Sequence, residues 1–302
     1  MVEHQFIQAH GIELAYDEFG DPAHPAMVLI MGMGTQMIAW PEAFCNGLAA
    51  CGYRVIRFDN RDIGLSQKME GVRAPSMLKA LALSRLKLTV KAPYTLMDMA
   101  EDTVGLMGAL GIKAAHLVGA SMGGMIAQLV AAYHPQRVLS LTSIMSTSGC
   151  RTLPGPAREV ALQLLRRPKS KDEQALLQHS MRTWRLIGSP AYQPSDEELT
   201  ERLAASYQRS HYPAGYTRQA VAIAASGDRV EALKRITAPT LVIHGKEDLL
   251  VPVEGGIDTA RLIPGARLEL IEGMGHDLPR PLLPHFVELI STHAAKSIAQ
   301  ID

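Results

Sequence analysis

Gly119-Ala120-Ser121-Met122-Gly123-Gly124 is the most informative segment of the chain. It joins an apolar run at 115–118 to a helical pattern at 122–133, so we predict a turn from a strand into a helix. Glycines on both sides of the serine match the pattern G-x-S-x-G, which in that context projects the serine hydroxyl from the edge of a sheet. The N-terminus of the following helix favours negative charge. Ser121 is therefore the candidate nucleophile of the chain.

Strand and helix patterns alternate outward from this turn. Eight short apolar or alternating runs predict strands, at 4–9, 12–19, 26–31, 53–58, 115–118, 138–145, 239–244 and 267–271. Helical patterns follow several of them, at 94–110, 122–133, 253–263 and 281–295. The first two runs are joined by His10-Gly11 and predict a hairpin. The sequence therefore predicts an α/β fold with a mostly parallel, eight-stranded sheet flanked by helices.

Residues 149–226 interrupt the alternation. Four amphipathic helical patches replace the strand patterns there, at 157–167, 172–185, 195–210 and 217–225. We predict a helical cap domain at 149–226, inserted after the sixth strand into a core domain made of residues 1–148 and 227–302. Within the core, residues 67–93 are predicted to form an extra lid segment. Leucines lie among basic residues in that segment, and the alternative is a helix that rests on a membrane surface.

A serine needs a base and an acid to become a strong nucleophile, and here they should follow it in the order acid, then histidine. Asp248 lies in the loop after its strand, where the carboxyl edge of a sheet can present it to Ser121. His276 follows the last strand, after two glycines that leave room for an imidazole. We predict that Ser121, Asp248 and His276 form a catalytic triad, with Glu247 as the alternative acid.

Acyl transfer also needs hydrogen-bond donors for the oxyanion that develops on the carbonyl oxygen. One donor is predicted to be the backbone N–H of Met122, the residue after the nucleophile. The second is assigned to the backbone N–H of Met33, in the loop after the strand at 26–31. Methionines adapt to irregular apolar shapes, so this region predicts a roomy substrate pocket, unless they only fill the core. The predicted lining residues are Met31, Gly32, Gly34, Met37 and Trp40.

The composition excludes several classes of function. Lys plus Arg and Asp plus Glu both number 30, so the formal net charge is zero and no global basic field attracts nucleic acid or an anionic membrane. The three cysteines lack the spacing of a metal site or a disulfide framework, and we expect a reducing compartment, no metal and no cofactor. The N-terminus lacks a signal-peptide pattern, and no apolar run reaches the about 18 residues of a membrane span. We expect a cytoplasmic monomer or homodimer without stable membrane anchoring.

Over nearly its whole length the chain resembles the α/β-hydrolase superfamily. The ordered segments at 119–123, 248 and 275–276 carry this resemblance, and Asp59-Asn60-Arg61-Asp62-Ile63-Gly64-Leu65-Ser66 resembles the family segment D-x-R-x-x-G-x-S. In that segment Asp59, Arg61 and Gly64 are expected to structure the loop rather than react. The shorter segments at 30–33, 39–41 and 273–279 resemble aclacinomycin methylesterase-like esterases, which hydrolyse a methyl ester on a polyketide.

The resemblance implies a carboxylesterase-type serine hydrolase that acts through an acyl-enzyme on small to medium apolar esters. Methyl esters, short or medium acyl esters and lactones are the expected small-molecule substrates. Ser121 differs from the aspartate nucleophile of haloalkane dehalogenases and epoxide hydrolases. Met31-Gly32 stands where many relatives have His-Gly, which leaves the backbone donor in place. Two alternatives stay open: cofactor-free perhydrolase or haloperoxidase-like activity on the same triad, and a ligand receptor with a slow triad.

Overall fold

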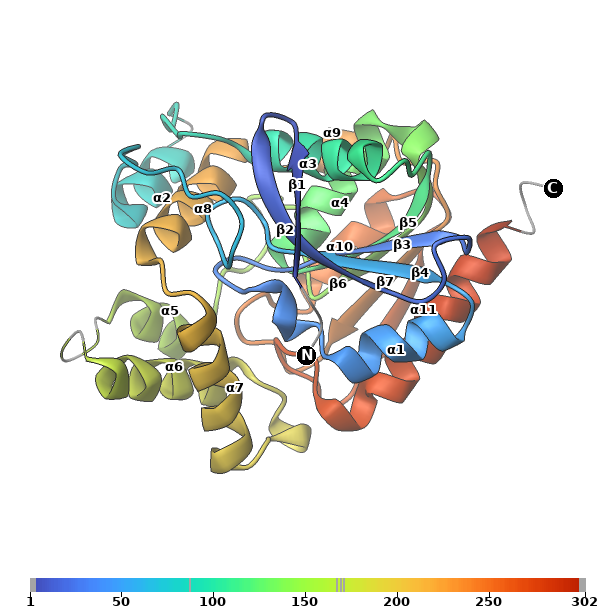
Figure 1. Cartoon of the computed structure of the whole chain (residues 1–302). Coiled ribbons are helices and arrows are strands. Elements are labelled where there is room, and N and C mark those ends of the chain that lie inside the picture. Colours follow the sequence, from blue (N-terminus) through green and yellow to red (C-terminus); the bar gives the residue numbers. More distant parts are fainter. Residues whose placement is uncertain (1–3, 87, 167, 169, 171, 299–302) are drawn as a thin grey trace.

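The computed structural model describes residues 4–86, 88–166, 168, 170 and 172–298. At its centre lies an eight-stranded sheet with the spatial order β1-β2-β4-β3-β5-β6-β7-β8 (Figure 1). The strands are β1 (Gln5–Ala9), β2 (Ile12–Phe19), β3 (Ala26–Ile30), β4 (Arg54–Phe58), β5 (Ala115–Ala120), β6 (Val138–Ile144), β7 (Thr240–Gly245) and β8 (Arg267–Ile271). β2 runs antiparallel to both β1 and β4, and the other neighbours are parallel. The predicted α/β fold with a mostly parallel, eight-stranded sheet is confirmed.

Helices cover both faces of the sheet. The α-helices are α1 (Glu42–Ala50), α2 (Met77–Arg85), α3 (Leu96–Ala109), α4 (Met122–Tyr133), α5 (Arg158–Leu165), α6 (Glu173–Ile187), α7 (Asp196–Arg209), α8 (Pro213–Ser226), α9 (Val230–Leu233), α10 (Glu254–Leu262) and α11 (Leu283–Ile298). Short 3-10 helices lie at Met37–Ala39, Pro135–Arg137, Pro190–Tyr192 and Arg280–Leu282. α3, α4 and α10 pack on one face, and α1 and α11 pack on the other (Figure 1). The sequence prediction missed α1 and α9.

β3 shows why the sequence of some strands is a continuous run of apolar residues. Val28 and Ile30 pack toward α3 and α4, whereas Met27 and Leu29 pack toward α1 and α11, and all four side chains are fully buried. Successive residues of a strand point to opposite faces, so a strand covered on both sides is apolar throughout. Because β3, β5, β6, β7 and β8 are parallel, their carboxyl ends share one edge of the sheet, where the candidate site residues emerge.

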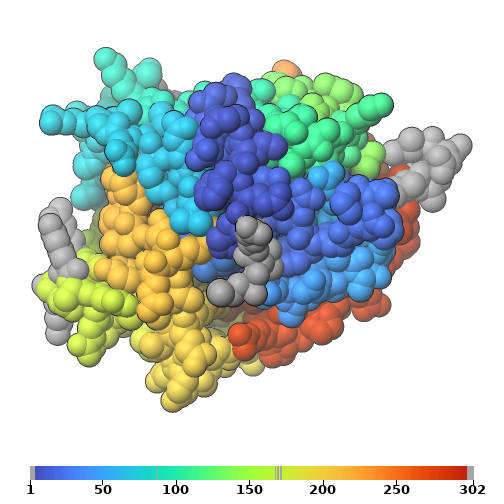
Figure 2. Space-filling model, in the orientation of Figure 1, coloured from blue at the N-terminus to red at the C-terminus, as the bar shows by residue number. Residues whose placement is uncertain are grey.

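The segment between β6 and β7 carries the helices α5, α6, α7, α8 and α9. Helices replace strands in the described residues of this segment, as the sequence predicts. Figure 2 shows that α6, α7 and α8, coloured from yellow-green to yellow-orange, form one continuous part of the surface in this view. α5, α6 and α7 lie beside the sheet rather than over one of its faces, whereas α9 packs against α4 (Figure 1). Its division from the core as a separate cap domain stays a prediction.

The predicted lid segment contains α2, which packs against α8. Ala80 is fully buried in a small apolar cluster with Val221 and Ala224 of α8. The opposite side of α2 remains exposed: Leu78 is 60% and Leu81 is 47% exposed, so the amphipathic pattern buries only one narrow face. The role of this segment as a lid stays a prediction. Across the described residues, no helix is both long enough and apolar enough to cross a lipid bilayer.

Candidate active site

Ser121 occupies a strained turn between β5 and α4. Its backbone has φ 56° and ψ −119°, a left-handed conformation that a residue with a Cβ rarely adopts. Glycines allow the turn on both sides, because a Cβ at Gly119 would overlap the carbonyl of Gly123, and a Cβ at Gly123 would overlap the carbonyl of Ile30. The half-buried Ser121 side chain therefore stands at the edge of the sheet, as the sequence motif predicts.

The structure brings the three predicted triad side chains together. Nε2 of His276 lies 3.0 Å from Oγ of Ser121, and Nδ1 of His276 lies 2.7 Å from Oδ2 of Asp248. The three residues follow the carboxyl ends of β5, β7 and β8, so the shared sheet edge gathers side chains that are far apart in the chain. Among the described residues, Asp248 and not the alternative acid Glu247 contacts the imidazole.

Asp248 is a buried carboxylate surrounded by donors. Oδ1 accepts the N–H groups of Leu250 at 2.9 Å and Val251 at 2.8 Å, and Oδ2 also lies 3.5 Å from Nε2 of His244. Burial alone would raise the pKa of Asp248, but His276 and His244 outweigh burial and hold that pKa well below its usual range. The carboxylate is therefore ionised and can orient the imidazole of His276.

The end of α6 holds the backbone of the loop that carries His276. The N–H of His276 donates to the carbonyl of Ile187 at 2.7 Å, and the N–H of Gly275 donates to Oγ of Ser189 at 3.0 Å. A Cβ at Gly275 would lie 2.6 Å from the carbonyl oxygen of Ile187, so glycine lets the two backbones approach. Ser189 in turn donates to the carboxylate of Asp277. Sequence reasoning missed Ser189 and Asp277, because a polar pair 88 residues apart leaves no local pattern.

The loop after β3 lies directly against Ser121. A Cβ at Gly32 would lie 3.1 Å from Cβ of Ser121. Within the part of the chain that the structure describes, the backbone N–H groups of Met33 and Met122 donate to no other protein group. A carbonyl oxygen that gains charge needs such donors close to the attacking nucleophile. Both amides are therefore free to serve as the predicted oxyanion donors.

The model for the α/β-hydrolase fold family matches residues 25–279 of this chain. The chain belongs to the α/β-hydrolase family. It is 31% identical to the rhodomycin D methylesterase DauP from a Streptomyces species, and 29% identical to the rhodomycin D methylesterase DnrP from Streptomyces peucetius. Each match covers 93% of this chain and 95% of the relative. The solved structure of the meta-cleavage product hydrolase CumD from Pseudomonas fluorescens covers 98% of both chains with a TM-score of 0.77 and 21% identity, which supports the fold. The family and the methylesterase relatives together support an esterase-type hydrolase.

Of the residues predicted to line the substrate pocket, two lie in the loop beside Ser121 and three have buried side chains. Gly32 and Gly34 lie in the loop beside Ser121, whereas the side chains of Met31, Met37 and Trp40 are buried. Trp40 packs on an aromatic ring of α1 with 5.4 Å between the ring centroids. Met31 and Trp40 also belong to the apolar cluster beneath α1 and α11. A substrate-lining role for these residues stays a prediction.

The hydrolase segment at 59–66 fastens the helical segment between β6 and β7 to the sheet. Asp59 forms an ion pair with Arg209 of α7 at 2.7 Å, and Asp62 accepts two hydrogen bonds from Arg218 of α8 at 2.7 and 2.8 Å. Gly64 has φ 56°, and a Cβ there would overlap the carboxylate of Asp59. These contacts also join the segment to α7 and α8, which the sequence does not show, and the expectation that the segment structures the loop rather than reacts stays a prediction.

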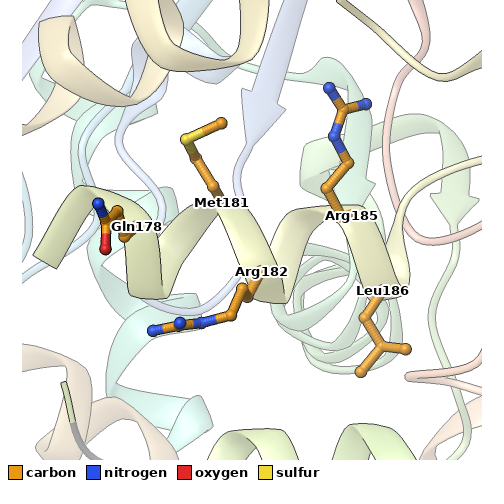
Figure 3. A pocket seen from close by; sticks show the side chains of 5 residues that line it. All are labelled: Gln178, Met181, Arg182, Arg185 and Leu186. Atoms are coloured by element: carbon orange, nitrogen blue, oxygen red, sulfur yellow. The ribbon is translucent and has the colours of Figure 1, made fainter. Parts of the chain in front are cut away.

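A surface cavity of about 550 Å³ lies along α6 of the hydrolase. Its lining residues are Gln178, Met181, Arg182, Arg185 and Leu186. Figure 3 shows Met181 and Arg185 projecting from one side of the helix and Leu186 from the other. None of the five residues belongs to the triad, but all lie on α6, whose last residue, Ile187, accepts the N–H of His276.

Proposed function

We propose that this chain is a serine carboxylic ester hydrolase that acts through an acyl-enzyme. One observation carries the proposal: Ser121, His276 and Asp248 form a continuous series of contacts, at 3.0 and 2.7 Å. Both distances lie within the hydrogen-bond range in which a base can take a proton from a nucleophile while an acid orients that base. The methylesterase relatives support the same class of reaction.

The proposed reaction has two halves. Oγ of Ser121 attacks the ester carbonyl while Nε2 of His276 accepts the serine proton, and Asp248 stabilises the resulting imidazolium. The N–H groups of Met33 and Met122 donate to the oxyanion. His276 then protonates the leaving alkoxide, which departs as the alcohol and leaves the acyl group on Ser121. Water, deprotonated by the same imidazole, attacks this acyl group and releases the carboxylic acid and the free serine.

The proposed substrates are small to medium apolar esters. Methyl esters, short or medium acyl esters and lactones belong to this class. Two relatives that the chain matches over most of its length are named methylesterases, which supports an ester with a small alcohol. The sequence around Met31, Met33 and Met122 is apolar, which supports an acyl group without charge.

Changing Ser121 to Ala tests the proposal. We expect kcat for p-nitrophenyl esters to fall by at least about 10⁴-fold, because no other group replaces the nucleophile. A fluorophosphonate probe should label wild type at Ser121, as mass spectrometry of peptides can show. Ser140→Ala, at a buried serine of β6 that contacts His116, is the matched control and should keep its activity.

The assay also separates the alternative functions. Steady turnover supports an enzyme, whereas a single burst without turnover supports a receptor with a slow triad. Bromination of monochlorodimedone in acetate with peroxide would support the haloperoxidase-like alternative. A large fraction of wild-type ester hydrolysis in Ser121→Ala would contradict the proposed function.

A further inference from the structure

Gln219, on α8, is fully buried against the loop that carries Met33. Oε1 of Gln219 accepts the N–H of Gly34 at 2.7 Å, and Nε2 donates to the carbonyl of Arg61 at 2.9 Å. One partner is a donor and the other is an acceptor, so they fix which end of the amide faces Gly34. The side chain thus joins the loop after β3 to the segment at 59–66.

Tyr216 covers the same loop from one turn earlier on α8. Gly34 has φ 67°, and a Cβ there would overlap the ring of Tyr216. Met33 is therefore held on both sides, because Gly32 lies against Ser121 and Gly34 lies against α8. Each peptide group is planar, and the N–H of Met33 belongs to the peptide between Gly32 and Met33, so the contacts at Gly32 and Gly34 restrain this amide from both sides.

The end of α7 holds the far end of the loop. Nε2 of Gln36 donates to the carbonyls of Ser206 at 2.6 Å and Ser210 at 2.9 Å, and its Oε1 accepts from Arg209 at 2.7 Å. The Gln36 side chain is buried, and its hydrogen bonds join residues 170 to 174 positions apart. The shape of the loop at 33–36 therefore depends on α7 and α8.

We propose that Gln219 is a positioning residue that aims the N–H of Met33 at the substrate oxygen. The inference rests on the proposed function, in which this N–H stabilises the oxyanion. Negative charge develops on that oxygen only after the nucleophile attacks, so a misplaced donor weakens the transition state much more than substrate binding. Loss of the Gln219 hydrogen bonds should therefore lower kcat and leave KM unchanged.

Two variants of Gln219 test this role. Gln219→Met keeps the length of the side chain but removes both hydrogen bonds, and kcat for p-nitrophenyl esters should fall about 10- to 100-fold with KM changed by less than about twofold. Gln219→Glu keeps an acceptor for the N–H of Gly34, and its kcat should stay within about fivefold of wild type. If Gln219 only stabilised the fold, kcat should fall more in Gln219→Glu than in Gln219→Met, because a buried carboxylate destabilises the fold more than a buried methionine side chain.

Gln163→Met is the matched control. Gln163 is also buried in the segment between β6 and β7, on α5, where its Nε2 donates to Thr183 at 3.2 Å. This variant loses one buried hydrogen bond but touches neither the loop at 33–36 nor the triad, so its kcat should equal that of wild type. A kcat loss as large as that of Gln219→Met would show that any loosening of the helical segment lowers kcat, and would overturn the specific role of Gln219.

Three further results bear on the proposal. Wild-type kcat in Gln219→Met, or a kcat in Gln219→Glu as low as in Gln219→Met, would overturn it. If Gln219→Met lacks a cooperative unfolding transition, Gln219→Glu alone gives the answer: kcat within about fivefold of wild type at a lowered Tm supports the role, and a larger loss at unchanged KM contradicts it. Wild-type turnover that survives Ser121→Ala would instead refute the proposed function, a result that no Gln219 variant can produce.

Discussion

Replacing Arg218 with Met is expected to lower the free energy of unfolding by about 3–5 kcal/mol. Arg218 donates to both carboxylate oxygens of Asp62, at 2.7 and 2.8 Å, and both side chains are buried. The variant would leave a fully buried carboxylate with two remaining donors, the N–H of Met69 and the hydroxyl of Tyr94, both at 2.8 Å. The expected loss is large because a buried charge without its counter-charge keeps its full desolvation cost.

Urea unfolding followed by far-ultraviolet circular dichroism measures this loss. Arg185→Met is the matched control, because Arg185 pairs with an exposed Asp196 and such surface pairs contribute less than about 1 kcal/mol. The double variant Asp62→Asn with Arg218→Met removes the buried charge altogether. It should therefore be more stable than Arg218→Met alone, by about 2 kcal/mol. A loss below about 1 kcal/mol in Arg218→Met, or strictly additive losses in the double variant, would refute the reasoning.

The same ion pair predicts a dependence on pH. Burial alone would raise the pKa of Asp62, but the hydrogen bonds from Arg218, Met69 and Tyr94 outweigh burial and lower that pKa. A lowered folded-state pKa means that the pair stabilises the fold above the unfolded value of about 4, and that this stabilisation is lost as the pH falls below it. The difference in unfolding free energy between wild type and Arg218→Met should therefore shrink in acid.

Other variants test the triad, the oxyanion donor and a buried histidine. Asp248→Asn should lower kcat about 10³- to 10⁴-fold in steady-state ester hydrolysis, because Asn favours the wrong tautomer of His276; a loss below about tenfold would contradict the triad. Met33→Pro removes the predicted N–H donor and should lower kcat about 10²- to 10³-fold in the same assay, whereas Met33→Leu should stay active. Burial lowers the pKa of His116 to about 4, so stability should fall as the pH drops from 6.5 toward that value. The fall should be at most about 3 kcal/mol, and urea unfolding of His116→Gln should lack it.

The meeting of Ser121, Asp248 and His276 could be predicted because each of the three lies in a short local pattern. Ser121 stands between glycines that follow a buried strand, and Asp248 and His276 each follow a strand in the required order. Parallel strands bring their carboxyl ends to one edge of the sheet, so the order along the chain is enough to bring the three side chains together. The hairpin of β1 and β2 could also be predicted from the sequence. Its turn residues, His10 and Gly11, adopt the positive φ values, 50° and 80°, that a two-residue turn requires.

α1 could not be predicted because its stability comes from packing. The helix contains Gly47, which lowers helix propensity. A Cβ at this position would lie 3.0 Å from the side chain of Val287 on α11, so glycine allows the two helices to pack closely. The close contact with α11 outweighs the propensity, and nothing near position 47 in the sequence shows that contact.

The contacts of the helical segment were also beyond sequence reasoning. Gln219 and Gly34 are 185 residues apart, and Asp62 and Arg218 are 156 residues apart. The pattern of each helix predicts which face is apolar, but it does not predict which loop of the sheet the helix will meet. The pairing of these polar groups follows from how α7 and α8 dock, which only the folded chain shows.

The candidate active site is therefore shared between the sheet edge and the helical segment. The side chains of the proposed triad come from loops of the sheet, but the carbonyl of Ile187 accepts the N–H of His276, and Gln219 accepts the N–H of Gly34. Both contacts require α6 and α8 to stay docked, and the ion pair between Asp62 and Arg218 fastens α8. If one interaction serves both stability and catalytic geometry, Arg218→Met should lower kcat as well as Tm, whereas Arg185→Met should lower neither. A variant Arg218→Met that unfolds more easily but hydrolyses esters at the wild-type rate would show that the loops hold their geometry without α8.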